Sequence, residues 1–344
     1  MTVGEWLDIW IKEYASDKKF GTVKTYQASI TNHIKPALGA VPLGKLTAPQ
    51  IQKFYNELGK TGHVIKKKDK KTGKVTITRQ PLSTKTIRNI HGAFTKALHV
   101  AVSVGYLETN PADRVTLPRV ERKEICPLSD NEVKAFFQAA ESDEYKFLLQ
   151  ILPFTGLRES EAIGLTWNCI DFEAGTITVK QQLLKKPKAD GGVILSSTKS
   201  GKTRTIQPAP MVMQLLKQRE VQQKEQRLQA GQLWEGWQNE KERKNALVFT
   251  TATGTYLSPQ TVYNHCRKIL DSIGAAAHCV HDLRHTYAVL SLQNGDPVKT
   301  VQENLGHATA AFTLDVYGHV SERMKQDSAD RMQAYMDKMK AASD

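Results

Sequence analysis

Helix-initiating patterns recur along this 344-residue sequence and constrain its fold more than any other feature. At the start of three apolar-periodic segments a hydroxyl residue stands three positions before Glu or Gln, which is the pattern of a helix capping box. These segments begin at Thr2, Thr47 and Ser129. Apolar residues at helical spacing follow them, and the second of these helices is expected to end at Gly59. Further helices are expected over residues 22–38 and 83–104, so the sequence predicts a mainly helical protein.

Two stretches alternate between apolar and polar residues and predict small antiparallel sheets. Within residues 60–80, HVI and VTIT flank Lys-Thr-Gly-Lys, which has the composition of a hairpin tip. Residues 176–184 and 203–207 alternate in the same way around a Lys- and Gly-rich hairpin. Residues 211–246 are rich in Gln, Glu and Lys and are expected to be helical.

The length and a proline-containing stretch favour two domains. A chain of 344 residues is more than twice as long as a typical single domain. A stretch with three prolines, mixed charges and no clear period follows residue 105, as is typical of a linker. We expect a helical domain over 1–118 with a basic hairpin insert at 60–80, a linker over 119–126, a mostly helical domain with one β-rich patch over 127–320, and a C-terminal tail over 321–344.

Positive charge is concentrated in the first third of the chain. The sequence has 48 Lys and Arg against 35 Asp and Glu, a net charge of +13. Residues 1–120 hold 20 of the basic and 8 of the acidic residues, and the insert at 60–80 has eight basic residues and one acidic residue. This distribution predicts a module that binds a polyanion, although solvated surface lysines are the simpler alternative. The lysines expected to contact nucleic-acid phosphates are Lys66, Lys67, Lys68, Lys70 and Lys71.

Several classes of protein are disfavoured by the sequence. No run of 18 apolar residues exists, and Glu5 and Asp8 interrupt the first apolar stretch, which argues against a membrane span and a signal peptide. The cysteines form no CxxC pair and fit a reducing cytosol. Gly-Lys-Thr at 201–203 lacks the upstream glycine of a nucleotide-binding loop, because Ser196 stands there. No acidic cluster of the two-metal nuclease type stands out.

Six residues in the second domain stand near the expected starts or ends of elements: Arg158, Lys199, His281, Arg284, His307 and Tyr317. Arg158 follows a turn glycine at a helix start, and Lys199 is expected at the tip or edge of the second hairpin. His281 and Arg284 are three residues apart, which places both on one face of a helix. Each feature is common by itself, whereas their joint occurrence in this order is specific.

These residues lie in motifs that occur together in one protein family. TGLRESE, HDLRHT, LGHA and DVYGHV resemble, in this order, the motifs of the tyrosine recombinase (phage integrase) family, most like the integrases of conjugative transposons or temperate phages. The upstream segment TYQASITNHIKPALGAVPLGKLTAPQIQKFYNEL is similar to the family's core-binding domain. The resemblance covers about residues 1–320 and implies a helical, SAM-like core-binding domain followed by an α+β catalytic domain.

The chemistry of DNA strand cleavage agrees with this resemblance. Cleavage requires a nucleophile, neutralisation of phosphate charge and an acid for the leaving oxygen. Two arginines suit the second task, because guanidinium groups bind phosphate oxygens bidentately and keep their charge. The resemblance implies that Arg158 and Arg284 clamp the scissile phosphate and that Tyr317 forms a 3′-phosphotyrosyl intermediate. Such an intermediate conserves the bond for rejoining, so that no ATP is required, and the resemblance implies no metal ion or other cofactor.

The resemblance also implies roles for the other three residues. His281 resembles the general base or acid near the tyrosine, and His307 resembles the histidine that hydrogen-bonds the phosphate. Lys199 resembles the hairpin lysine that protonates the leaving 5′ oxygen. Lys202 is the alternative, because hairpin alignments slip easily, and the match of TKSGKTRTI to the family's hairpin favours Lys199.

Other acidic, tyrosine and histidine residues near these motifs are expected to orient the arginines or to have structural roles. Glu161 resembles an acid that orients an arginine, and Asp282 is expected to act similarly. Tyr287 and Tyr335 are alternative nucleophiles, but neither follows Gly-His at the expected spacing. The residues expected to be packing or surface residues are Tyr287, His285 and His319.

The sequence therefore predicts a site-specific DNA recombinase that integrates or excises a mobile element. The resemblance implies a homotetramer on two double-stranded core sites, with the tail at 321–344 packed on a neighbouring protomer. It also implies an excisionase or a host DNA-bending protein as a partner, and a cytoplasmic, nucleoid-associated location. A type IB topoisomerase-like enzyme and a non-catalytic DNA-binding protein of the same fold are the alternatives. The core-binding pattern begins almost at Met1, which leaves open whether an arm-binding domain is missing by truncation.

Overall fold

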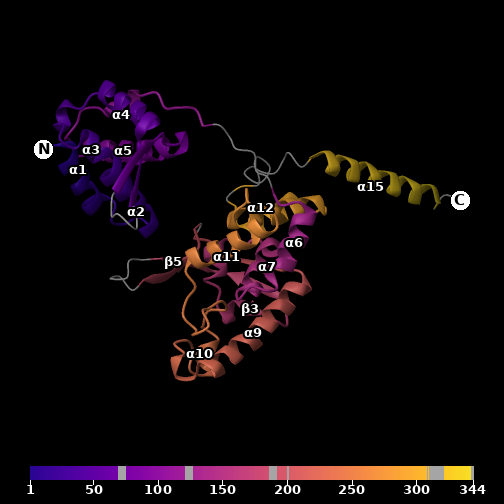
Figure 1. Cartoon of the computed structure of the whole chain (residues 1–344). Helices are drawn as coiled ribbons and strands as arrows, with labels where there is room; N and C mark the ends of the chain where they lie inside the picture. The colour runs from indigo at the N-terminus through magenta and orange to yellow at the C-terminus, as the bar shows by residue number, and fades with distance from the viewer. Residues whose placement is uncertain are drawn as a thin grey trace. The chain divides into compact units, whose positions relative to one another are not determined.

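The computed structural model describes residues 1–68, 75–120, 127–185, 192–199, 201–307, 309 and 321–341 (Figure 1). The chain divides into two compact units, Met1–Lys123 and Glu124–Asp344. Helices dominate both units, and the described strands form small antiparallel sheets, which confirms the predicted fold class. No helix within the described ranges is long and apolar enough to cross a membrane.

In its described residues, the first unit consists of helices and one pair of antiparallel strands. Its elements are α1 (Val3–Ile9), α2 (Phe20–Ser29), α3 (Lys35–Leu38), α4 (Ala48–Thr61), β1 (His63–Lys68), β2 (Val75–Gln80) and α5 (Thr84–Ser103). The capping boxes at Thr2 and Thr47 are both present, which confirms these predictions. Helix α4 runs past Gly59 to Thr61, because its buried apolar face outweighs the cost of about 1 kcal/mol for one interior glycine.

A buried tryptophan joins the first and last helices of this unit. Trp6 is fully buried, and its indole Nε1 donates a hydrogen bond to the main-chain oxygen of Ala97 at 2.9 Å. The proline-containing segment then packs back on the same unit. The main-chain N–H of Thr116 donates to Gln52 Oε1 at 2.8 Å, and Arg88 Nε donates to the oxygen of Pro118 at 2.9 Å. The chain is therefore held to the first unit as far as Pro118.

The second unit places helices around short strands. Its elements are α6 (Asp130–Ala140), α7 (Lys146–Thr155), α8 (Glu159–Ala162), β3 (Ile170–Asp171), β4 (Thr176–Val179), β5 (Gln181–Lys185), β6 (Val193–Ser197), β7 (Arg204–Ile206), α9 (Pro210–Ala230), α10 (Glu240–Arg243), α11 (Pro259–Ser272), α12 (Val280–Gln293), α13 (Val298–Leu305) and α15 (Ser321–Ala341). The capping box at Ser129 begins α6 as predicted.

The prediction of one strand over residues 176–184 is wrong in one respect, because this segment forms two strands that belong to two different sheets. Strand β4 pairs with β3 and β7, whereas β5 pairs with β6. The buried positions explain the break: Ile177 and Val179 alternate, Lys180 is exposed, and the next buried residues are Gln182 and Leu183. Gln182 departs from the odd-numbered phase of Ile177 and Val179, whereas Leu183 keeps it, so the simple alternation of one strand is interrupted after Lys180.

The helix expected over residues 211–246 is also shorter than predicted. Helix α9 ends at Ala230, and Gly231 follows with a positive φ of 53°. Trp234 and Trp237 then pack edge to face with ring centroids 6.0 Å apart. Trp234 Nε1 donates to the main-chain oxygen of Trp237 at 2.9 Å, so this pair is local packing.

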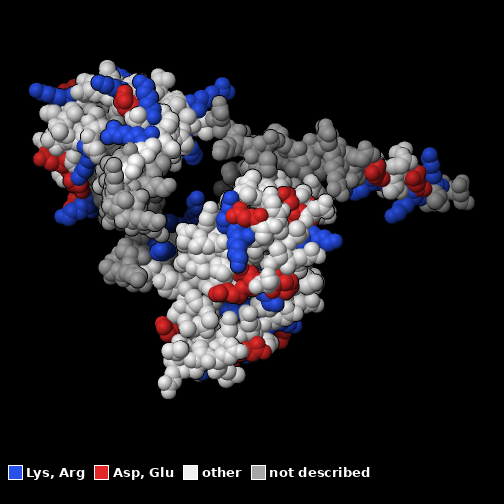
Figure 2. All heavy atoms as spheres, viewed as in Figure 1, with Lys and Arg blue, Asp and Glu red and all other residues white. Residues whose placement is uncertain are grey.

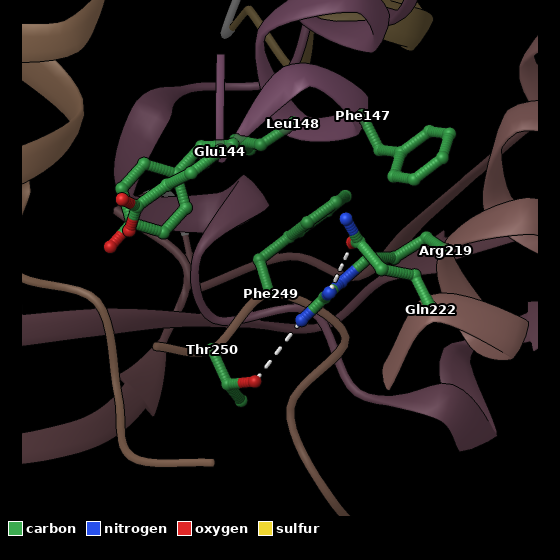
Figure 3. Close-up of a pocket in the computed structure, with 8 residues that line it drawn as sticks. Glu144, Phe147, Leu148, Arg219, Gln222, Phe249 and Thr250 are labelled. Atoms are coloured by element: carbon green, nitrogen blue, oxygen red, sulfur yellow. Dashed lines mark hydrogen bonds between the residues drawn. The ribbon is translucent and has the colours of Figure 1, made fainter. Parts of the chain in front are cut away.

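A buried arginine holds α9 to the chain that follows it. Arg219 Nε donates to the oxygen of Val248 at 3.0 Å, and its terminal nitrogens donate to Gln222 Oε1 at 2.6 Å and Thr250 Oγ1 at 3.1 Å (Figure 3). The adjoining cavity has a volume of about 10 Å³, which accommodates one water molecule at most. Arg219 therefore has a structural role.

Candidate active site

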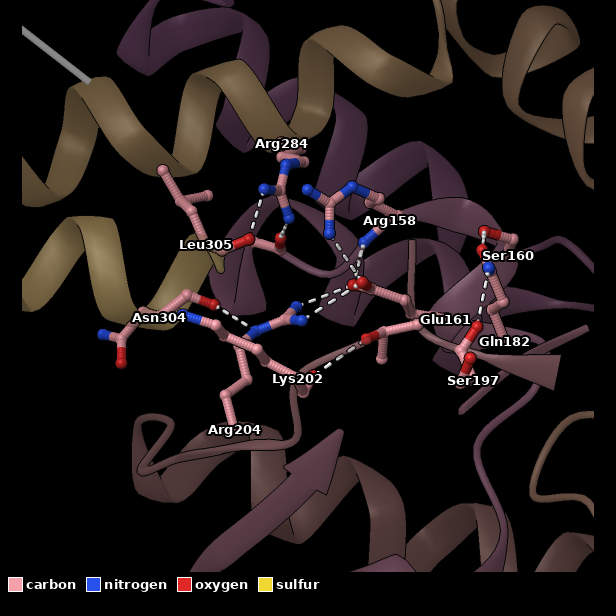
Figure 4. Close-up of polar contacts among 12 residues, drawn as sticks. Arg158, Ser160, Glu161, Gln182, Ser197, Lys202, Arg204, Arg284, Asn304 and Leu305 are labelled. Carbon is pink, nitrogen blue, oxygen red and sulfur yellow. Dashed lines mark hydrogen bonds and ion pairs between the residues drawn. The ribbon is translucent and has the colours of Figure 1, made fainter. Parts of the chain in front are cut away.

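Arg158 lies where two helices of the second unit meet. Helix α7 ends at Gly156, and Arg158 is the residue that caps the N-terminus of α8, which confirms its expected place at a helix start. Its main-chain N–H donates to Glu161 Oε2 at 2.9 Å, and its Nη1 donates to Glu161 Oε1 at 2.7 Å (Figure 4). The expectation that Glu161 orients an arginine is therefore confirmed.

Glu161 also binds a second arginine, Arg204, which the sequence did not reveal as a site residue. Arg204 donates through Nη2 to Oε2 at 2.6 Å and through Nη1 to Oε1 at 3.1 Å. Burial alone would raise the pKa of Glu161, but Arg204 and Arg158 lower it to about 2. A sequence signal did exist: Arg204 lies two residues before Ile206 in a strand, hence on the buried face, where an arginine needs an acidic partner.

Arg284 enters the same region from α12. Its side chain is buried, and its two terminal nitrogens donate to the main-chain oxygens of Gly156 and Leu305, the C-terminal ends of α7 and α13 (Figure 4). These bonds fix the plane of the guanidinium group. The helix end at Gly156 has little room, since a Cβ there would lie 2.5 Å from Tyr287 Cδ1, and its φ is +61°. The glycine therefore allows the carbonyl to reach Arg284.

Tyr287 and Asp282 have structural roles near the arginines. The hydroxyl of Tyr287 accepts a hydrogen bond from Asn304 Nδ2 at 2.9 Å, and the residue packs against Gly156. Asp282 was expected to orient an arginine, but its Oδ2 accepts the main-chain N–H of Cys279 at 2.8 Å. That contact is the capping box of α12. A carboxylate in the first turn of a helix satisfies the N–H groups exposed there, which explains the difference.

Three histidines stand near the arginines and are held in the neutral form. His307 follows Gly306, the left-handed residue that ends α13, and its main-chain oxygen accepts from Gln302 Nε2 at 2.8 Å. Burial and then the charges of Arg284 and Arg158 lower the pKa of His307 to about 3. Loss of hydration and then Arg284 also lower the pKa of His281. The rings of His281 and His285 pack edge to face at 4.8 Å between centroids.

Lys199, expected at the tip or edge of the second hairpin, lies just after the end of β6. Lys199 is exposed in the loop between β6 and β7, at the base of the β5–β6 pair instead of its tip. This loop is held by Thr198, whose Oγ1 donates to the oxygen of Lys202 at 2.8 Å. Lys199 is among the cations that lower the pKa of His281, along with Arg284 and Arg158, so its charge acts on the site.

Some predicted site residues lie outside the part of the chain that the structure describes. They are Tyr317, His319, Lys70 and Lys71. Residues Lys66, Lys67 and Lys68 belong to β1, which pairs with β2 as the predicted hairpin requires. Within the described residues, the site thus brings together Arg158, Arg284, His281, His307 and the loop of Lys199.

This arrangement suits the binding and cleavage of a phosphodiester. Two guanidinium groups provide positive charge, one at the start of α8 and one held by the ends of α7 and α13, and neutral histidines beside them can donate or accept protons. Among the described residues, no group of three or more His, Cys, Asp and Glu side chains is arranged to hold a metal ion.

The lowered histidine pKa values predict that acid destabilises the protein. The pKa is about 3 for His307 and about 4 for His285, against an ordinary value of 6.5. The unfolded chain binds these protons first, so the free energy of unfolding is greatest above pH 6.5 and falls towards pH 4, by at most ~1.4 kcal/mol per pH unit for each histidine. Denaturant unfolding at pH 7.5, 6 and 5 measures the slope. The doubly substituted His307→Gln, His285→Gln protein should have a flatter slope, and an unchanged slope would contradict the assignment.

Sequence comparison places both units in one family. The pattern of the phage integrase family matches residues 127–324, and that of the phage integrase N-terminal SAM-like domain matches residues 2–59. The chain is 28% identical to the XerC-like tyrosine recombinase of Caldanaerobacter subterraneus subsp. tengcongensis, over 96% of this chain and 83% of that protein. It is 25% identical to the ICEBs1 integrase of Bacillus subtilis, over 95% of this chain and 81% of that protein.

Solved structures show the same fold. The Tn1549 transposon integrase in complex with a circular intermediate DNA has a TM-score of 0.74 and 20% identity, and the match covers 96% of this chain and 99% of that one. A lambda integrase dimer bound to a core site has a TM-score of 0.64 and 18% identity, over 92% of this chain and 77% of that one.

Proposed function

Because this chain belongs to the phage integrase family of tyrosine recombinases, we propose that it is a site-specific recombinase that integrates or excises a mobile DNA element. The observation that carries the proposal is the convergence of Arg158 and Arg284 on the ends of α7, α8 and α13, beside His281 and His307. The names of similar proteins, among them the ICEBs1 integrase and the Tn1549 transposon integrase, support a mobile-element role.

The proposed reaction begins with attack of the Tyr317 hydroxyl on the scissile phosphorus. The phenol has a reference pKa near 10 and must lose its proton, and neutral His281 can accept that proton. A bond forms between the tyrosine oxygen and phosphorus while the bond from phosphorus to the 5′ oxygen breaks. Lys199 donates a proton to the leaving 5′ oxygen, which departs as a hydroxyl group.

Charge on the transition state is balanced by residues that the fold holds rigidly. Arg158 and Arg284 bind the nonbridging oxygens, and neutral His307 donates a hydrogen bond to one of them. Because the DNA 3′ end stays attached to tyrosine, a 5′ hydroxyl from another strand can reverse the reaction on a new partner. The bond energy is thereby conserved, and these steps use neither ATP nor a metal ion.

The first unit and the basic insert are proposed to bind the DNA backbone. Figure 2 shows Lys and Arg side chains spread over the visible face of the first unit, with Asp and Glu side chains among them, and both signs of charge on the visible face of the second. We expect the two units to clamp the duplex from opposite faces, and four protomers to assemble on two core sites. The segment at 321–344 would contact a neighbouring protomer, and an excisionase or a DNA-bending protein would set the direction of the reaction.

An assay for strand exchange tests this function. The protein is incubated with two labelled duplexes that carry the ends of its element, and, separately, with a supercoiled plasmid that lacks those ends. Recombinant strands between the duplexes support the proposal. Plasmid relaxation without strand exchange would instead show a type IB topoisomerase-like enzyme, and binding without any cleavage would show a non-catalytic DNA-binding protein.

The two lysines of the β6–β7 loop are expected to differ sharply in their effect on cleavage. Lys199→Ala should slow cleavage about 10²–10³-fold, because the 5′ oxygen then leaves without a proton. A substrate with sulfur at that 5′ position should restore the rate, because a thiolate leaves unprotonated. Single-turnover cleavage measures both effects, and Lys202→Ala is the matched control. If Lys202→Ala instead slows cleavage and the sulfur-containing substrate restores its rate, Lys202 is the acid.

Replacing the lysines of the insert with neutral residues is expected to weaken DNA binding and to make the affinity less dependent on salt concentration. If all five lysines contact phosphates, the slope of log affinity against log salt concentration should become shallower by about 4.5 when they are replaced by Ala. Titration with core-site DNA over a salt series measures the slope. Exposed Lys241 and Lys244 of the second unit, replaced together, are the control. An unchanged slope would reject a role for the lysines: Lys66, Lys67, Lys68, Lys70 and Lys71.

A further inference from the structure

We propose that Arg204 is a positioning residue that keeps Arg158 available to the scissile phosphate, by compensating the charge of Glu161 and aligning its carboxylate. This role rests on the proposed function, because it assumes that Arg158 binds a phosphate. Arg204 itself is not a catalytic residue in this scheme, since it acts through Glu161.

Arg204 makes more side-chain hydrogen bonds to the Glu161 carboxylate than Arg158 does. Both oxygens of Glu161 accept hydrogen bonds from Arg204, at 2.6 and 3.1 Å, whereas the Arg158 side chain contributes one, from Nη1 at 2.7 Å. The Glu161 side chain is fully buried, and those of Arg204 and Arg158 are 10% and 21% exposed. The carboxylate therefore faces two guanidinium groups with no water between them (Figure 4).

The net charge of this cluster determines how strongly it attracts a phosphate. One carboxylate and two guanidinium groups have a net charge of +1, so the cluster still attracts a phosphate. Without Arg204, the buried Glu161 would be compensated by Arg158 alone, and the pair would be neutral. Arg158 would then be drawn to both carboxylate oxygens, and a phosphate would have to compete with Glu161 for its N–H groups.

Arg204 also connects three elements that contribute to the site. It lies in β7, binds Glu161 of α8, and donates through Nε to the oxygen of Asn304 in α13 at 2.7 Å. A Cβ on Gly306 would lie 3.1 Å from Arg204 Nη1, so the guanidinium packs directly under the residue that precedes His307. This set of contacts needs a planar group with several N–H donors, which lysine does not offer.

The test compares two substrates that differ in the charge at the scissile phosphate. In one, a methylphosphonate replaces the phosphate, which removes the negative charge that Arg158 must neutralise. Arg204→Met should slow cleavage of the ordinary substrate about 10²-fold, as expected for loss of a charge-stabilising group, and Arg204→Lys should slow it less. On the methylphosphonate, both variants should approach the wild-type rate, and Arg158→Met should behave in the same way.

Arg219→Met is the matched control, because Arg219 is also a buried arginine of the second unit but serves packing alone. Its ratio of rates on the two substrates should equal that of the wild type. Rates are compared well below the unfolding midpoint of each variant, and Arg204→Gln replaces Arg204→Met if the latter does not fold. Equal losses on both substrates, or no loss on either, would overturn the proposal. Failure of the proposed function is distinguishable, since the wild type itself would then cleave neither substrate or would relax a plasmid without strand exchange.

Discussion

Tyr317→Phe is expected to reduce strand cleavage by at least about 10³-fold, because it removes the nucleophilic oxygen and keeps the aromatic ring. Single-turnover cleavage of end-labelled core-site DNA measures the loss. Affinity for the same DNA should stay close to that of the wild type, since the phenol hydroxyl is proposed to act on the scissile phosphorus and not in binding. The residual rate then reports what the arginines and histidines achieve without a nucleophile.

Two other tyrosines provide controls for this result. Tyr335 of α15 is 61% exposed, and Tyr287 accepts a hydrogen bond from Asn304. Tyr335→Phe and Tyr287→Phe should each retain covalent activity, with Tyr287→Phe losing some thermal stability. If either control loses the covalent adduct while Tyr317→Phe retains it, the assignment of the nucleophile is wrong.

Arg284→Lys is expected to lower cleavage about 10²–10³-fold, the usual cost of removing one fixed charge-stabilising donor. Arg284 donates to the oxygens of both Gly156 and Leu305, and the same planar group must also face the phosphate. A lysine has one nitrogen on a flexible stem and cannot hold two helix ends and an anion in a fixed geometry. The charge is retained in this variant, so the loss measures geometry.

The thermal unfolding midpoint must be measured for the same variant, because Arg284 is 3% exposed and its contacts also stabilise the fold. Arg267→Lys on α11 is the matched control: Arg267 pairs with Asp271 at 3.0 Å near the surface. Its cleavage rate should match that of the wild type. A folded Arg284→Lys protein with a wild-type cleavage rate would contradict the proposed clamp.

The local features of the fold were predictable because each depends on neighbours in sequence. The capping boxes at Thr2, Thr47 and Ser129 depend on contacts three residues apart. Arg158 at a helix start and His307 after a left-handed glycine follow from similarly local patterns. The motifs therefore gave the positions of the candidate residues along their elements.

What could not be predicted depends on contacts between distant segments. Arg204 pairs with Glu161 across 43 residues, and nothing in either segment alone specifies the other. The break at Lys180 reflects which sheet each strand joins, and strand partners are set by the whole unit. Gly156 likewise looks like an ordinary helix end, although its carbonyl positions Arg284 from 128 residues away.

These distant contacts explain how the site can be rigid before DNA arrives. The ends of α7, α8 and α13 are joined by Arg284, Glu161 and Arg204, so the guanidinium groups are oriented by main-chain oxygens and a buried carboxylate. Groups held in this way need little reorganisation when charge develops on the phosphate, which is the condition for strong electrostatic stabilisation.

The central claim is that DNA is cleaved through a covalent bond to one tyrosine, and the most direct test is to identify that bond. The wild-type protein is incubated with a suicide substrate from which the short fragment carrying the released 5′ hydroxyl diffuses away after cleavage. The covalent product is then digested and analysed by peptide mass spectrometry. One DNA-linked peptide is expected, with Tyr317 joined to the 3′ phosphate. No linked peptide, a link to another residue, or a link to a 5′ phosphate would contradict it.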